Sequence, residues 1–135
     1  MPAQRLTSQN KIYKDLDLDF DIHPNTKQLN TLTEDLAVVR SLKNLIFTSH
    51  YERPFHPEIG CKIKRSLFDN IMPSTAMTIQ NSIEEVVENF EPRINLTAVD
   101  VRAVSDENRY EVNIKFFVIN EATSRQVTFF LERIR

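Results

Sequence analysis

The sequence predicts an α+β fold in which two long helices and a short one pack on an antiparallel C-terminal three-stranded meander. Stretches 33–49 and 74–90 carry apolar residues at the three- and four-residue spacing of an amphipathic helix. Stretches 94–104, 110–119 and 125–134 are strand-like and are separated by short polar turns. Short connections favour antiparallel pairing, so the last three stretches predict a meander.

Composition is that of an ordinary globular domain. The 135 residues fit one domain, 1–135, with residues 1–10 as a flexible polar arm. A net charge of −2 and the lack of a long apolar run predict neither a nucleic-acid nor a membrane partner. Gly60 is the one glycine, which excludes a Gly-rich phosphate loop. Cys61 is the one cysteine, which excludes an internal disulfide and favours synthesis in a reducing cytoplasm.

An acidic, apolar segment lies near the N-terminus, with the sequence IYKDLDLDFDIHP. Its period of two predicts a half-buried strand, with aspartates on the solvent side. The apolar side comprises Leu16, Leu18, Phe20 and Ile22. The D-x-D-x-D spacing resembles a calcium loop, but Phe20 and Thr26 stand where that loop needs Gly and Glu. We therefore interpret the segment as an N-terminal edge strand or arm.

The first long helix, 33–49, is expected to begin at Thr33 as its N-cap. Its apolar stripe comprises Leu36, Val39, Leu42, Leu45 and Ile46. Such a stripe packs on the protein's own sheet in most single domains, although a partner's groove is the alternative.

The chain between the two long helices contains an irregular loop, 50–61, and a short helix within 62–71. Gly60 is expected to adopt a positive φ there, because a Cβ would clash. Ser74 is the expected cap of the second long helix, and Pro92 ends that helix.

The second strand of the meander has two different faces. The face expected beneath the helices is apolar throughout and comprises Tyr110, Val112, Ile114, Phe116 and Val118. The reverse face begins polar and ends apolar, and the third strand adds apolar residues to it. The resulting back-face patch comprises Phe117, Ile119, Phe130 and Ile134. A sheet covered on one side has a solvated back, so this patch indicates either a partner interface or a surface beneath the N-terminal strand.

No constellation of residues supports catalysis or metal binding. His50, His56, Glu58 and Cys61 share one loop, but their spacing matches no zinc site. There is no strained nucleophile motif, and no pair of acids is placed for glycoside hydrolysis. We therefore expect no catalytic residue, no metal, no cofactor and no enzyme activity.

Three stretches resemble one protein family. "RPFHPEIGC", "LFDNIMPSTAMTIQNSI" and "NFEPRI" are similar, in order and spacing, to the small baseplate wedge, or sheath-initiator, proteins of contractile-tailed, T-even-like phages. The type VI secretion baseplate counterpart belongs to the same family. The resemblance covers residues 11–135.

The resemblance implies a structural protein of the virion tail baseplate, made in the host cytoplasm. In this family the Glu-Pro-Arg segment docks on the helical core bundle of the wedge, which here implies Glu91, Pro92 and Arg93. The resemblance of the Arg-Pro-Phe…Pro-Glu-x-Gly loop to the family implies a partner-binding loop with Arg53, Phe55 and Glu58.

The resemblance also implies that the strands at 110–119 and 125–134, with the back-face patch, template the first sheath ring by β-strand exchange. The implied partners are other wedge proteins, the tail sheath protein, and tail tube or hub proteins. Two other functions stay open: a lysozyme-like baseplate enzyme that degrades peptidoglycan, and a regulatory anti-adaptor, which is the role of a distant relative.

The geometry of the Glu-Pro-Arg segment also leaves an alternative. An extended chain alternates sides at each residue, so Glu91 and Arg93 point to the same side. The carboxylate and the guanidinium can therefore pair with each other or with a partner's groups.

Overall fold

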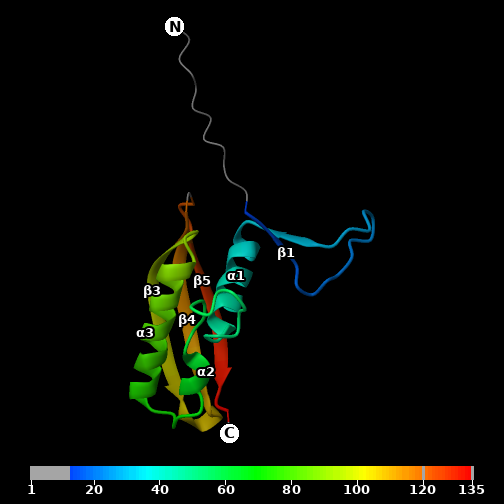
Figure 1. Ribbon diagram of the computed structural model, residues 1–135. Coiled ribbons are helices and arrows are strands. Elements are labelled where there is room, and N and C mark those ends of the chain that lie inside the picture. The colour runs from blue at the N-terminus through cyan, green and yellow to red at the C-terminus, as the bar shows by residue number, and fades with distance from the viewer. Residues whose placement is uncertain (1–12, 120, 135) are drawn as a thin grey trace. The chain divides into compact units, whose positions relative to one another are not determined.

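A computed structural model describes residues 13–119 and 121–134 (Figure 1). The chain contains two compact units. The first, here called the hairpin unit, ends at Ala37, and the second, here called the body, begins at Val38. None of the described helices is long and apolar enough to cross a membrane.

The hairpin unit contains two short antiparallel strands. β1 (Lys14–Leu16) pairs with β2 (Thr31–Thr33), and an isolated bridge joins Ile22 to Leu29. The predicted strand through Ile22 is wrong because the chain turns after Leu16, where the Phe20 N–H donates to the Asp17 carbonyl. The expected half-burial is also wrong. The four apolar side chains of this segment are 39% to 63% exposed: Leu16, Leu18, Phe20 and Ile22.

The first long helix, α1 (Asp35–Phe47), begins later than predicted. Thr33 is the last residue of β2 rather than an N-cap, and Glu34 has a positive φ of 53°. Leu36 in the first turn is exposed, so the predicted stripe is shifted. The buried residues of α1 are Ala37, Val38, Leu42, Leu45 and Ile46.

The body contains two further helices, α2 (Ile63–Ser66) and α3 (Pro73–Phe90). Met72, not Ser74, occupies the N-cap of α3, and it forms no side-chain cap bond. Pro73 begins the helix instead, since its fixed φ suits the first helical position, where no N–H is needed. α3 ends at Phe90, as Pro92 predicts.

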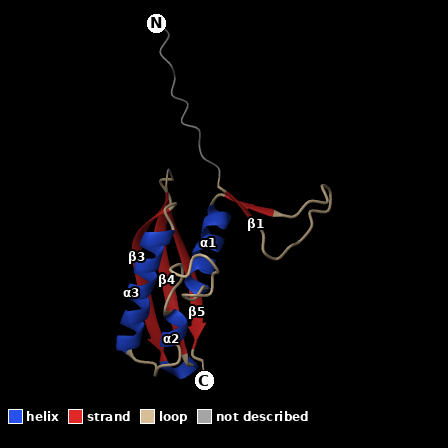
Figure 2. Ribbon diagram, viewed as in Figure 1, coloured by secondary structure: helices blue, strands red, loops and turns tan. Residues whose placement is uncertain are grey.

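Three antiparallel strands form the sheet in the order β3-β4-β5, as predicted. They are β3 (Ile94–Val104), β4 (Arg109–Val118) and β5 (Ser124–Glu132). α1 and α3 lie side by side over one face of this sheet, which Figure 2 shows in blue over red.

The core lies between the helices and the inner face of the sheet. All five residues predicted for the inner face of β4 are buried: Tyr110, Val112, Ile114, Phe116 and Val118. The ring of Phe47 at the end of α1 lies 5.7 Å from that of Phe129 on β5. β4 is apolar on this side along its whole length because it is the central strand beneath the helices.

Candidate docking site

The Glu-Pro-Arg segment joins α3 to the first strand of the sheet. The Glu91 N–H donates to the Val87 carbonyl, 3.0 Å away, and so completes the last turn of α3. The Arg93 carbonyl accepts a hydrogen bond of 2.9 Å from the N–H of Ile119. Pro92 between them is exposed. The backbone of the segment is therefore fixed at both ends by the helix and the sheet.

The two charged side chains of the segment bind each other. Arg93 Nε donates to Glu91 Oε1 at 2.6 Å, and Arg93 Nη2 donates to Oε2 at 2.8 Å. Ser41 Oγ on α1 donates to the same Oε2 at 2.7 Å. The Glu91 side chain is 3% exposed and that of Arg93 is 23% exposed. Of the two pairings that the sequence left open, the internal one is present.

The buried carboxylate of Glu91 is stabilised in its ionised form. Burial alone raises the pKa of Glu91, but hydrogen bonds from Arg93 and then Ser41, with the nearby positive charge, outweigh it and lower the pKa below its usual value. A bidentate guanidinium–carboxylate pair is strong and fixes the plane of both groups. The pair therefore connects α1, the end of α3 and the start of β3.

The partner-binding loop predicted at 50–61 is closed at its base. The Cys61 N–H donates to the Thr48 carbonyl at 2.7 Å, and the Tyr51 N–H donates to the Pro57 carbonyl at 3.0 Å. Gly60 has a φ of +149°, as expected, and a Cβ there would lie 2.6 Å from the carbonyl carbon of Ser49. The loop is therefore compact, its two ends lie close together, and its base requires glycine.

The tip of this loop carries the three predicted binding residues, Arg53, Phe55 and Glu58, and all are exposed. Phe55 is 96% exposed and has a φ of 71°. A positive φ is uncommon for an aromatic residue, and such strained positions cluster at functional sites. The backbone therefore holds a large apolar ring outside the body.

A pocket lies between this loop and the C-terminal half of α3. Glu58 lines it from the loop, and Glu85, Asn89 and Phe90 line it from the helix. Phe90 directly precedes the Glu-Pro-Arg segment, so the pocket connects the two predicted docking elements. The pattern of the sequence did not single out Glu85 and Asn89, because polar residues on a helix indicate only a solvated face.

The predicted back-face residues do not form one patch. Phe117 pairs with Ser124, whereas Phe130 pairs with Glu111, so the two aromatic residues are about 20 Å apart along the sheet. Polar side chains occupy the middle, where Thr128 Oγ1 donates to Asn113 Oδ1 at 2.5 Å. Ile119 follows β4 near Phe117, and Ile134 lies beyond β5, with its N–H bound to the Leu67 carbonyl.

The described residues contain no cluster of three or more His, Cys, Asp or Glu side chains placed for a metal ion. His56 Nδ1 lies 3.1 Å from Glu58 Oε1 at the exposed tip of the loop. Cys61 is buried, and this burial raises the pKa of its thiol, which is the opposite of what a nucleophile requires.

Known proteins are similar to this chain in sequence and in fold. A family model described as baseplate wedge protein gp25 matches residues 33–123. The baseplate wedge protein gp25 of Enterobacteria phage T4 is 39% identical over 111 residues, which are 82% of this chain and 83% of that protein. The chain belongs to the baseplate wedge protein gp25 family.

Three solved structures resemble this gp25-family chain. A putative tail lysozyme from Geobacter sulfurreducens has a TM-score of 0.66 and 25% identity, and the match covers 73% of this chain and 89% of that one. A chain of the anti-feeding prophage baseplate has a TM-score of 0.70, 24% identity and coverages of 82% and 89%. A chain of the postcontracted pyocin R2 baseplate has a TM-score of 0.55, 18% identity and coverages of 89% and 98%. The last two likenesses concern the fold alone.

The gp25 family match takes in both predicted docking elements. Residues 33–123 include the loop at 50–61 and the Glu-Pro-Arg segment. The match begins at the last residue of β2 and ends one residue before β5. The acidic segment of the hairpin unit therefore lies outside the matched range.

Proposed function

We propose that this protein is a structural subunit of a contractile phage tail baseplate that docks on the helical core bundle of the wedge and templates the first sheath ring by β-strand addition. The observation that supports this proposal is the 39% identity with the baseplate wedge protein gp25 of phage T4 over four-fifths of both chains. Its partners are then other wedge proteins, the tail sheath protein, and tube or hub proteins, within the virion tail.

The proposed docking surface combines the loop tip, the pocket and the Glu-Pro-Arg segment. Pro92 and part of the Arg93 side chain are accessible, and Phe55 projects from the loop. Glu91 is buried, so its role in docking is to position the guanidinium of Arg93. A side chain that is already held in place loses less conformational entropy when a partner binds it.

The proposed sheath contact uses the edge of the sheet. β5 is an outer strand of the order β3-β4-β5, and an outer strand can accept a strand from another chain. Strand addition uses backbone hydrogen bonds and does not need one continuous apolar patch. The separation of Phe117 from Phe130 therefore leaves this mode of assembly intact.

Phe55 provides a direct test of docking. We expect Phe55→Ala to keep the unfolding midpoint of the wild type, because the ring is almost fully exposed, and to lower incorporation into a wedge co-expressed from its component proteins. Phe68→Ala is the matched control, since Phe68 is also exposed but lies after α2, outside the proposed surface. If Phe55→Ala is incorporated as well as the wild type, the loop is not part of the docking site.

A lysozyme-like activity is the second candidate, because the Geobacter neighbour is described as a putative tail lysozyme. Glycoside hydrolysis needs a carboxylic acid whose pKa is raised. Glu91 is the one acidic residue that is buried as a whole in the described part of the chain, and its partners lower its pKa. We expect no clearing of peptidoglycan suspensions by the purified protein. Sustained clearing that disappears on replacing a single Asp or Glu would support the enzyme instead.

A further inference from the structure

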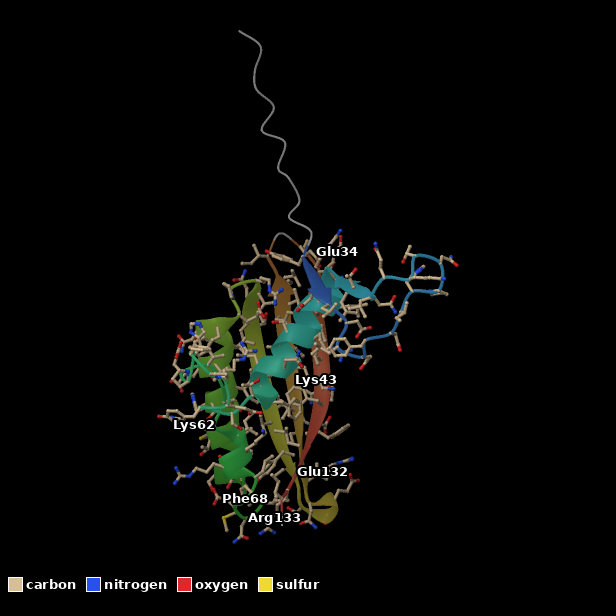
Figure 3. The ribbon with its side chains drawn as sticks, turned by 45° about the vertical axis from the view of Figure 1, so that its right-hand side comes forward. Glu34, Lys43, Lys62, Phe68, Glu132 and Arg133 are labelled. Carbon is tan, nitrogen blue, oxygen red and sulfur yellow. The ribbon has the colours of Figure 1, made fainter. Side chains whose placement is uncertain are left out.

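A second pocket of the body, here called the basic pocket, lies between the loop at 50–61 and α2. Its rim carries three exposed cationic side chains, Lys62, Lys64 and Arg65. Tyr51, which is 86% exposed, and the buried Cys61 also line it. Figure 3 labels Lys62, which lines this pocket, and Lys43 on α1. The basic pocket thus presents apolar surface inside a cationic rim.

The rim keeps an excess of positive charge. Lys64 Nζ lies 3.3 Å from Glu52 Oε2, and both side chains are 52% exposed. Such an exposed pair contributes little to the stability of the fold. Lys64 can therefore leave Glu52 and bind another carboxylate at a small cost in free energy. The described residues that line the basic pocket include three cations and no carboxylate. The pocket therefore has the chemistry to bind an acidic peptide segment with large apolar side chains.

The hairpin unit contains a segment of that chemistry. Residues 15–22, here called the acidic segment, alternate aspartates with large apolar residues. Those apolar side chains are exposed in the hairpin unit, and a two-stranded hairpin is at best marginally stable by itself. Exposed apolar side chains that occur together are typical of an interaction site. The acidic segment therefore has reason to bind a surface that is both basic and apolar.

We propose that the acidic segment of one copy of this chain binds the basic pocket of a second copy. The carboxylates would contact the rim, and an apolar side chain such as Phe20 would enter between Tyr51 and the aliphatic stems of the lysines. The contact joins two different surfaces, so its repetition gives a ring or an open chain of subunits rather than a closed pair. Neither Arg93 nor Phe55 lines the basic pocket, but Lys62 lines both this pocket and the one within the proposed docking surface.

An exchange of charges tests the proposal with the full-length chain. One variant, Asp15→Lys with Asp19→Lys and Asp21→Lys, makes the segment basic, and a second, Lys62→Glu with Arg65→Glu, makes the pocket acidic. All five side chains are exposed, so both variants are expected to show the wild-type circular dichroism spectrum. We expect the average molar mass of the wild-type protein in sedimentation equilibrium to rise with protein concentration at low salt. At high salt the association should weaken, because salt screens the attraction between the charges.

Each variant alone is expected to associate about tenfold or more weakly than the wild type, because like charges then meet. An equimolar mixture of the two is expected to restore association, because each acidic surface again has a basic counterpart. Lys43→Glu is the control, since Lys43 is exposed on α1 and does not line the pocket; it should associate as the wild type does. A wild type whose mass does not depend on concentration, or a mixture that stays monomeric, would overturn the proposal.

A synthetic peptide of residues 14–23 gives a measurement that does not depend on the folding of any variant. We expect the labelled peptide to bind the wild-type protein in fluorescence anisotropy and to be displaced by salt. The same peptide with its four aspartates replaced by asparagine should bind about tenfold or more weakly. Equal binding of the two peptides would contradict the proposed role of charge.

Discussion

Glu91 combines a buried position with an ionised side chain. The sequence predicts that Glu91 and Arg93 lie on one side of the chain, and the bidentate contact confirms this. The contribution of Ser41 could not be predicted, because it depends on how α1 packs 50 residues away in sequence. The alternation of an extended chain is a local property, whereas the choice between an internal and an external partner depends on tertiary packing.

Replacing Glu91 should reveal the pair in the pH dependence of stability. We expect Glu91→Gln to lower the free energy of unfolding at pH 7 by about 1–3 kcal/mol. The pKa of Glu91 is lowered in the folded state, so the ionised pair stabilises the fold above the ordinary glutamate pKa, about 4.3. That contribution is lost as the pH falls through the lower folded value. Urea denaturation at pH 7 and at pH 3 should therefore show a smaller difference between variant and wild type in acid.

Asp100→Asn is the control for this measurement. Asp100 also pairs with an arginine two residues later, Arg102, but both side chains are mostly exposed. We expect a change within about 0.5 kcal/mol. An equal loss in both variants would show that burial does not strengthen the pair. Arg93→Ala leaves the buried Glu91 without its guanidinium, so its stability must be measured before any loss of assembly is assigned to docking.

At the scale of elements, periodicity predicted the helices and the meander but not the helix caps. Thr33 and Ser74 are both good capping residues, yet Thr33 belongs to β2 and Ser74 lies in the first turn of α3. Ser and Thr also occur in strands and within helices, so a local signal cannot decide between these places. The inner face of β4 was predicted fully, because five alternating apolar residues in a central strand have one consistent interpretation.

Two adjacent residues of β4 test the assignment of its faces. Phe116 is fully buried, and Phe117 points to the opposite, partly exposed face. We expect Phe116→Ala to lower the free energy of unfolding by about 3–5 kcal/mol. Phe117→Ala should lower it by about 1 kcal/mol or less. Equal losses in chemical denaturation would mean that the outer face of the sheet is covered in solution.

At the scale of the whole molecule, the sequence did not predict where apolar surface would be left exposed. The alternation in the acidic segment shows which side chains share a side but not what covers them, and all four are exposed. The prediction of one continuous back-face patch was wrong for a related reason. The strand register places Phe117 and Phe130 at opposite ends of the sheet, and the register of β4 with β5 depends on the connection between these two strands.

Removal of β5 tests the proposed sheath contact. A chain truncated before Arg125 should, where circular dichroism shows it to be folded, still associate with the hub and wedge but fail to start a sheath. Full-length Phe129→Ala is the control, because it loses a core side chain of β5 but keeps the strand edge. We expect sheaths of normal length with this control in electron micrographs. Normal sheaths on particles with the truncated chain would refute strand addition.

The closed base and exposed tip of the loop at 50–61 allow assembly to be followed by limited proteolysis. Its ends are joined by the Cys61–Thr48 and Tyr51–Pro57 hydrogen bonds, while Phe55 stands outside the body. Chymotrypsin, which cleaves after aromatic residues, can therefore nick the tip and leave the two fragments bound to each other by the intact core. A nick that occurs in the isolated protein and is blocked in a wedge would mark the moment at which the loop becomes covered.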